Sequence, residues 1–245
     1  MNTETLLLFY LLLFFVAFMY SSVGHGGASG YLALMAFFSF APVTMRPTAL
    51  LLNIFVSLTS FIQYYRGKHF KWKLFYPFAI ASVPAAFIGG LVTINPKWYK
   101  IILGILLLFS VIRLLGIKTD ENKPHKKQSL LLSLLIGALI GLLSGMIGIG
   151  GGIILSPVIL LLQWGNMKQT AAVSALFILV NSLAGMAGLF TKQFHFDSSM
   201  LTMIVIAFVG GLLGSYLGAL KINNTMLKKV LAIVLLMASV KLLLA

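Results

Sequence analysis

The stretch Gly148-Ile149-Gly150-Gly151-Gly152 lies in the middle of a long apolar run, Leu130 to Trp164. A weaker copy, Gly24-His25-Gly26-Gly27, lies in the middle of another apolar run, Leu6 to Phe40. Glycine costs about 1 kcal/mol relative to alanine inside a helix, so this density of glycines predicts a helix break. In a membrane, broken backbone is tolerated where protein buries it or where it lines a wet cavity. We expect the two breaks to face each other and to form a site for a small solute.

The composition around these breaks is typical of an integral membrane protein. Of the 245 residues, 60% are hydrophobic and 9% are charged, and the mean hydropathy is +1.05. Apolar runs of about 18 residues or more, the length needed to cross a hydrocarbon core, recur from end to end. The absence of cysteine excludes disulfides and thiol chemistry. The net charge of +14 comes from cations in short loops, where they orient the chain in the cell membrane, so we expect no nucleic-acid partner.

The two halves of the chain are similar to each other. The stretch Met45-Arg46-Pro47-Thr48-Ala49 matches Met167-Lys168-Gln169-Thr170-Ala171, and the two glycine breaks align as well. Each half holds about four to five hydrophobic segments. The sequence therefore predicts an all-α polytopic membrane protein with a first transmembrane repeat at 1–116, a cytoplasmic linker at 117–128 and a second repeat at 129–245. Pro42 and Arg46-Pro47 predict a loop before a helix that begins near Thr48.

Loop charges predict that the repeats are inverted. If each glycine break is the tip of a hairpin that returns to its starting side, most cations collect on one side of the membrane. The cations that remain on the other side are Arg46, Lys97, Lys100, Lys192 and Lys241. A single interrupted span in place of each hairpin divides the cations more evenly, so the positive-inside rule favours hairpins, a cytoplasmic linker and both termini outside. The charges leave open whether the hairpins cross fully or turn back near the midplane.

Inverted repeats with interrupted helices are typical of transporters, in which half-helix N-termini near the midplane point at anionic groups. The predicted substrate-binding residues are those of the two breaks and two asparagines: Gly24, His25, Gly26, Gly27, Asn53, Gly148, Gly150, Gly151, Gly152 and Asn181. The asparagines either contact the ligand or hold helices together. His25 donates to an anion, titrates during transport or is a neutral histidine bonded to backbone. The separated glycines favour close helix packing instead: Gly137, Gly141, Gly145, Gly210, Gly211, Gly214 and Gly218.

Two pairs of residues stand just before or at predicted helix starts, one pair in each half. They are Arg46 with Thr48 and Lys168 with Thr170. Inverted repeats place them at opposite mouths, where they either act as a gate that attracts anions or are ordinary loop cations. The spans contain no paired carboxylates, histidine cluster or nucleophile motif, so we predict no catalytic residues, no metal, no cofactor and no enzyme activity. An anion channel and a non-transporting membrane subunit remain alternatives, and the sequence leaves open whether the protein forms a homo-oligomer.

The run from Gly148 to Pro157, GIGGGIILSP, resembles the G-x-G-G-G-x-x-x-x-P signature of the TauE/SafE family of sulfite exporters. The duplicated organisation and total length are also similar to that family, and the resemblance covers essentially the whole chain. The first break departs from the signature, with Ala28 in place of the third consecutive glycine and Ala33 at the proline position. The resemblance implies transport of small sulfur-containing anions such as sulfite and organosulfonates. Together with the predicted inverted halves, it leads us to expect a secondary transporter that exports such anions by alternating access. The sequence leaves open export versus import and whether a coupled ion is needed.

Overall fold

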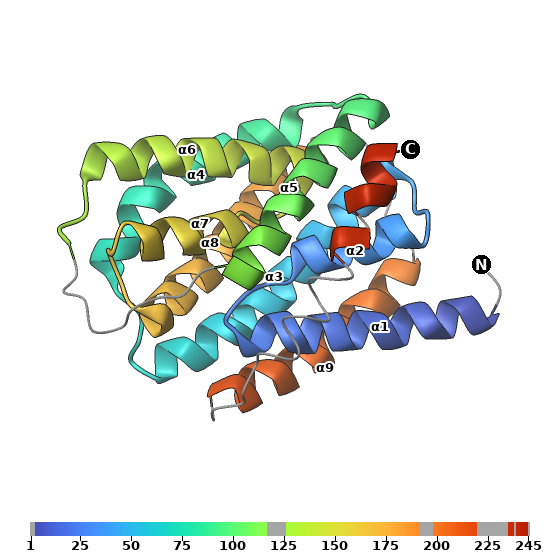
Figure 1. Cartoon of the computed structure of the whole chain (residues 1–245), viewed down its shortest axis with the longest axis horizontal. Helices are drawn as coiled ribbons and strands as arrows, with labels where there is room; N and C mark the ends of the chain where they lie inside the picture. The colour runs from blue at the N-terminus through green and yellow to red at the C-terminus, as the bar shows by residue number, and fades with distance from the viewer. Residues whose placement is uncertain (1–2, 117–125, 192–197, 220–234, 238, 245) are drawn as a thin grey trace.

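The computed structural model describes residues 3–116, 126–191, 198–219, 235–237 and 239–244, and the regular elements in these ranges are all α-helices (Figure 1). Six of these helices are long and apolar enough to cross a membrane by length and composition. They are α1 (Thr3–Ser22), α3 (Pro42–Arg66), α4 (Trp72–Leu91), α6 (Leu130–Ile147), α8 (Met167–Phe190) and α9 (Ser198–Ala219). The described part of the chain is thus an all-α bundle with six candidate membrane spans.

Two short helices follow the glycine breaks. Helices α2 (Ala28–Phe37) and α7 (Gly152–Leu161) have 10 residues each, or about 15 Å, which is half the thickness of a hydrocarbon core. Helix α2 folds back along α1: the Tyr20 hydroxyl bonds the Ser29 hydroxyl at 2.6 Å, and the Phe38 ring lies 5.4 Å from that of Phe9. Each break is therefore the tip of a hairpin whose second arm is too short to cross.

Helix α3 begins earlier than the sequence predicts. The expected loop at Pro42 and Arg46-Pro47 is wrong, because α3 starts at Pro42. The carbonyl of Ala41 accepts the backbone N–H groups of Thr44 and Met45, which closes the first turn. Proline lacks a backbone N–H. At the first helical position this costs nothing, because an N–H there would have no partner inside the helix. Pro47 lies inside the helix, one turn later.

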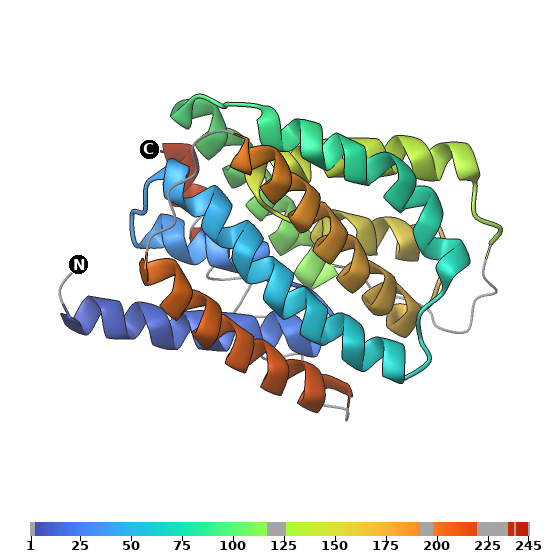
Figure 2. The same ribbon diagram turned by 180° about the vertical axis from the view of Figure 1, so that it is seen from behind.

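The six long helices run in two opposite directions. Helix α4 runs parallel to α6, with Phe78 beside Gly137 and Ser82 beside Gly141. Helix α1 runs parallel to α9 in the same way. Helices α3 and α8 are antiparallel, since Gly185, late in α8, packs against Leu50, early in α3. Figure 2 shows α3, α8 and α9 side by side. As a result α1, α3 and α9 point one way, and α4, α6 and α8 point the other.

Glycines on one helix lie against backbone carbonyls of its neighbour. A Cβ on Gly137 would lie 2.5 Å from the Phe78 carbonyl oxygen, and one on Gly210 would lie 2.5 Å from that of Phe14. Gly141, Gly145 and Gly214 are as close to carbonyls of α4 or α1. These contacts confirm the prediction that the separated glycines serve close packing. The packing around Gly218, near the end of α9, lies outside what the structure describes.

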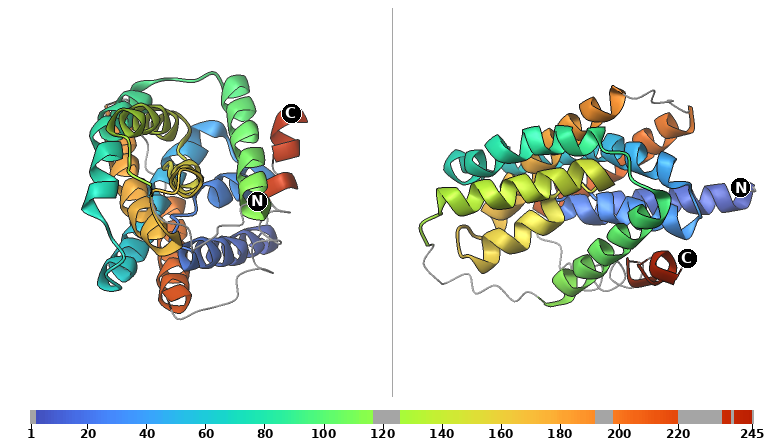
Figure 3. Two further views of the ribbon diagram at one scale, coloured as in Figure 1. Left: turned by 60° about the vertical axis from the view of Figure 1, so that its left-hand side comes forward. Right: turned by 90° about the horizontal axis from the view of Figure 1, so that it is seen from above.

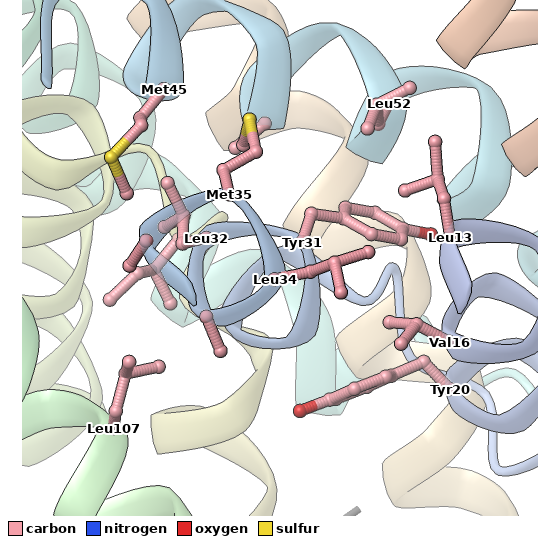
Figure 4. Packing of buried hydrophobic residues seen from close by; sticks show 14 of the residues in the cluster. Leu13, Val16, Tyr20, Tyr31, Leu32, Leu34, Met35, Met45, Leu52 and Leu107 are labelled. Carbon is pink, nitrogen blue, oxygen red and sulfur yellow. The ribbon is translucent and has the colours of Figure 1, made fainter. Parts of the chain in front are cut away.

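Two hydrophobic cores hold the half-helices. Around α2 the core includes Leu13, Val16, Tyr31 and Leu52, which Figure 4 shows converging from α1, α2 and α3. The residues of α2 from Ala28 to Ala36 are all buried. Helix α7 has a smaller core shared with α4, α6 and α8. Both half-helices are thus surrounded by protein, which is the setting in which a membrane tolerates broken backbone.

Helix α5 (Pro96–Gly116) lies at one edge of the bundle, next to the helical residues at the C-terminal end (Figure 3). The Ser239 hydroxyl donates to the carbonyl of Gly104 at 2.8 Å, which joins α5 to these C-terminal residues.

The outer face of α6 is apolar and exposed, with Leu131, Leu135 and Leu139 all more than half accessible. Such a face suits contact with lipid.

Candidate functional site

Both breaks require glycine at the point where the second arm begins. Gly27 is the residue before α2 and has φ 94°, and Gly151 is the residue before α7 and has φ 81°. These left-handed conformations are costly for residues that carry a Cβ. Glycine has no side chain with which to cap a helix, and the first-turn N–H groups of an α-helix have no partner inside it. Each half-helix therefore presents its positive N-terminal end to the break.

The two breaks meet at one side chain. A Cβ on Gly26 would lie 2.7 Å from Asn53 Oδ1, and one on Gly150 would lie 2.5 Å from Asn53 Nδ2. Ile178 of α8 is also close to both glycines, with its Cγ2 atom 2.8 Å from each Cβ position. Asn53 lies near the middle of α3. The structure therefore brings both breaks together against the central parts of the two antiparallel helices α3 and α8.

The polar side-chain atoms at this meeting point have no hydrogen-bond partners among the described residues. Asn53 is fully buried, and neither its amide nitrogen nor its amide oxygen forms a hydrogen bond. The Ser182 hydroxyl is also fully buried and unpaired, 3.2 Å from the Cβ position of Gly150. Leaving a buried polar group unsatisfied costs about 1–3 kcal/mol. A cluster of such groups between two helix N-termini is a concentration of hydrogen-bonding capacity that the protein itself does not use.

Asn181, the second predicted asparagine, is also fully buried on α8. Its amide nitrogen donates to the carbonyl of Phe177 at 2.8 Å, while its amide oxygen has no partner. The adjacent residue, Ser182, is the one in contact with the second break. Asn181 is therefore next to the meeting point in sequence, and half of its hydrogen-bonding capacity is already used.

His25 links the first break to the second half of the chain. Its Nε2 lies 2.8 Å from the Ser156 hydroxyl of α7, and its Nδ1 lies 3.0 Å from the carbonyl oxygen of Val23. The Ser156 hydroxyl also reaches the carbonyl of Gly152 at 2.9 Å and the Ser174 hydroxyl of α8 at 2.8 Å. This buried chain runs from His25 through Ser156 to Ser174.

The outer glycines of the breaks contact the starts of the long helices. Gly24 lies against Ala171, in the first turns of α8, and against the Tyr64 ring; Gly148 lies against Arg46, in the first turns of α3. Each break thus passes from the start of one long helix to the middle of α3 and α8. Gly152 packs against Ile178, so Gly26, Gly150 and Gly152 are the predicted glycines that lie at the meeting point.

Arg46 is buried, and its guanidinium donates to four backbone carbonyls. Its Nε bonds Gly145 at 2.8 Å, its Nη1 bonds Val92 at 2.9 Å, and its Nη2 bonds Gly89 at 2.7 Å and Gly90 at 2.8 Å. These carbonyls belong to the C-terminal ends of α4 and α6, where positive charge is favourable. Arg46 therefore joins two helix ends, and anion attraction by it stays a prediction.

The other residues of the predicted gates lie near helix starts. Thr48 donates to the carbonyl of Thr44 at 2.7 Å, and the buried Thr170 hydroxyl has no partner. Lys168 is exposed at the start of α8. Partial burial and, after it, the charge of Lys168 lower the pKa of His69, which lies in the loop between α3 and α4. Lys168 therefore lies near the loop that follows α3, whereas Arg46 lies near the start of α3, at the opposite end of the bundle.

Two residues at the breaks were not among the predicted site residues. Tyr31 is fully buried, its hydroxyl has no partner, and this oxygen lies 2.7 Å from the Cβ position of Gly27. Its position one turn after the break is the signal that could have identified it. Ser182 had only its polarity within an apolar segment as a signal, since its partner Gly150 is distant in sequence.

Comparison with known proteins places this chain in a family. Residues 9–242 match the family described as Sulfite exporter TauE/SafE. The "Probable membrane transporter protein y4hK" of Sinorhizobium fredii (strain NBRC 101917 / NGR234) is 34% identical over 234 residues, which are 94% of this chain and 95% of that protein. No solved structure matches this chain.

Proposed function

The chain belongs to the TauE/SafE family of sulfite exporters, and from this premise we propose that it is a secondary transporter that exports small sulfur-containing anions, such as sulfite or organosulfonates, across the cell membrane. The observation that carries the proposal is the meeting of the two glycine breaks at the unpaired amide of Asn53. Two half-helix N-termini and a buried donor side chain are the elements that transporters use to hold anionic groups near the midplane.

The chemistry of the site favours an anion with several oxygens. The Asn53 amide and the Ser182 hydroxyl supply hydrogen-bond donors, and the N-terminal turns of α2 and α7 supply backbone donors. Glu4, at the far end of α1, is the one acidic residue in the described part of the chain. An anion at the breaks therefore meets donors from several directions and no carboxylate of a described residue that would repel it.

We further propose that residues 1–116 and 129–245 are inverted repeats joined by a cytoplasmic linker at 117–128. The directions of the helices support this: α1, α3 and α4 of the first half correspond in order to α6, α8 and α9 of the second, and each pair is antiparallel. The contacts between the halves follow the same correspondence. Helix α4 of the first half packs along α6 of the second, and their counterparts α9 and α1 pack along each other. An axis relating the halves would pass near Asn53 and Ile178.

Such an arrangement supports alternating access. Each half contributes one hairpin tip and one long helix to the site, so a rocking of one half against the other would open the site to one side at a time. With the cell interior negative, outward movement of one anion gains about 2.3 kcal/mol per 100 mV. Export of an anion can therefore proceed without a coupled ion gradient. In the proposed orientation, both termini would face outside.

A thermal-shift screen of the purified protein tests the proposal. Sulfite, organosulfonates and carboxylates are added to the wild type, to Asn53→Leu and to the control Leu139→Ala, whose side chain is 61% exposed on the outer face of α6. We expect a sulfur oxyanion to raise the melting temperature of the wild type and of Leu139→Ala and to leave that of Asn53→Leu unchanged. A screen in which no anion shifts the wild type, or in which Asn53→Leu shifts equally, contradicts the proposed site.

A further inference from the structure

We propose that Tyr31 binds the transported anion through its hydroxyl, and that this contact lets the site select an anion with three oxygens, such as a sulfonate, over a carboxylate. The inference rests on the proposed function, because it adds a contact to the same anion site. It comes from two observations. The Tyr31 hydroxyl forms no hydrogen bond with any described residue, and it lies against Gly27, the residue before α2.

The geometry of α2 directs the Tyr31 side chain back to the first break. Tyr31 is in the first turn of the helix, where its backbone N–H donates to the carbonyl of Gly27 at 3.0 Å. Side chains on an α-helix point toward its N-terminal end, so the phenol extends over the turn before Tyr31. Its hydroxyl oxygen and the ring carbon that carries it both lie 2.7 Å from the Cβ position of Gly27. A buried donor therefore lies beside the positive N-terminal end of α2.

Packing explains the ring of Tyr31 but not its hydroxyl. Tyr31 is fully buried, and its ring packs in the core around α2 with side chains that include Leu13 and Leu52 (Figure 4). A phenylalanine would fill the same space. The hydroxyl of a buried tyrosine usually has a hydrogen-bond partner, and a buried polar group without one is costly. The unpaired hydroxyl therefore indicates a partner that comes from outside the protein.

The second half of the chain builds the same kind of half-helix without a hydroxyl at this position. Leu155 stands four residues after Gly151, as Tyr31 stands four residues after Gly27, and both side chains are fully buried. The two half-helices have equal lengths of 10 residues. Formation of a half-helix after a glycine break therefore does not require this hydroxyl, which supports a role in binding.

Together with Tyr31, the two breaks are in contact with three side chains that have an unused hydrogen-bond donor. On the side of the second break, Asn53 Nδ2 and the Ser182 hydroxyl lie 2.5 Å and 3.2 Å from the Cβ position of Gly150. On the side of the first break, Asn53 also contacts Gly26, directly before the glycine that Tyr31 contacts. A sulfonate has one oxygen for each of these three donors. A carboxylate has two oxygens and leaves one buried donor unpaired, which disfavours its binding.

Titration calorimetry of the purified protein with methanesulfonate and with acetate tests the role of Tyr31. We expect the wild type to bind methanesulfonate more tightly than acetate. Tyr31→Phe keeps the ring and removes the donor, so it should weaken methanesulfonate binding by about 10- to 100-fold, the value of one hydrogen bond to a charged group. Acetate binding should change much less. The control Tyr216→Phe, whose side chain is 57% exposed on α9, should bind both anions as the wild type does.

The outcomes separate this inference from the proposed function. Unchanged methanesulfonate binding in Tyr31→Phe, or an equal loss for both anions, overturns the role of Tyr31 and leaves the site at Asn53 intact. Absence of binding of methanesulfonate and of sulfite to the wild type overturns the proposed function as well. The melting temperature of ligand-free Tyr31→Phe should equal or exceed that of the wild type. A lower value, or failure to fold, would show that the hydroxyl serves the fold, and it would also overturn the inference.

Discussion

Asn53 is the residue at which the two glycine breaks meet, and its fully buried amide forms no hydrogen bond within the part of the chain that the structure describes. In an ordinary core this amide would be a defect, since an unsatisfied buried group costs about 1–3 kcal/mol. In a binding site the same cost is recovered when a ligand supplies the missing hydrogen bonds. A packing defect and a binding site therefore predict different effects of an apolar substitution at Asn53.

Asn53→Leu keeps the branched shape of the side chain and removes the unpaired amide. We expect the ligand-free variant to be as stable as the wild type or up to about 1–3 kcal/mol more stable, because no hydrogen bond is lost. Equilibrium unfolding in detergent measures this. A clear loss of stability would show that the amide holds the helices together. Asn181→Leu is the matched comparison, because its amide nitrogen does bond the Phe177 carbonyl, so that variant should be less stable than wild type.

The sequence was sufficient to locate the residues of the breaks but not their partners. Consecutive glycines mark a break locally, and Gly24 to Gly27 and Gly148 to Gly152 are where the helices end. That Gly26 and Gly150 both touch Asn53 depends on contacts between residues far apart in the chain, which no local pattern encodes. Arg46 illustrates the same limit, since its four acceptors lie on α4 and α6.

At the scale of the elements, glycines line the close contact between α4 and α6. Gly137, Gly141 and Gly145 recur every four residues on α6 and lie against carbonyls of α4. Side-chain packing and close backbone approach are the main forces that join helices in lipid, where burial of apolar surface gives no advantage. The spacing of these glycines was visible in the sequence, but the identity of the partner helix was not.

Gly141→Ala tests this contact. The added methyl group would meet the backbone of Ser82, which cannot move aside as a flexible side chain would. We expect a loss of stability of about 1–3 kcal/mol, the usual cost of an overpacked contact. The control Leu135→Ala, on the exposed face of the same helix, should change stability by less than about 0.5 kcal/mol. Equal stabilities for Gly141→Ala and wild type would contradict the close packing.

The start of α3 shows why element boundaries were harder to predict than elements. Two prolines and an arginine within six residues are typical of a loop, yet α3 begins at Pro42 and contains both Arg46 and Pro47. Proline fits the first turn of a helix because its missing N–H is not needed there. The buried position of Arg46 is stabilised by carbonyls from other helices, so tertiary contacts outweigh the local signal.

At the scale of the whole molecule, the opposite directions of the two helix sets support inverted repeats, and the repeats predict a membrane orientation. The loop between α3 and α4 would be cytoplasmic, and the turn between α4 and α5 would be outside. The chain has no cysteine, so single cysteines can be introduced without removing others. Lys68 is exposed in the first of these connections, and Lys97 is exposed in the first turn of α5, directly after the second.

We expect a membrane-impermeant thiol reagent applied to intact cells to label Lys97→Cys and not Lys68→Cys. Permeabilised cells should label both, and the cysteine-free parent should label in neither condition. The positive-inside rule underlies this expectation, since the α3–α4 loop carries Arg66, Lys68, Lys71 and Lys73. Labelling of Lys68→Cys in intact cells would reverse the orientation, and labelling of both positions would contradict an odd number of crossings between them.

Counterflow in proteoliposomes tests the central claim, that the two breaks form one anion site that opens to each side in turn. Vesicles loaded with unlabelled sulfite or an organosulfonate are diluted into a trace of the labelled anion. We expect transient accumulation of label by the wild type and by Leu139→Ala, saturable with concentration, and none by Asn53→Leu. Uptake that only follows the gradient would indicate a channel, and undiminished counterflow in Asn53→Leu would contradict the site.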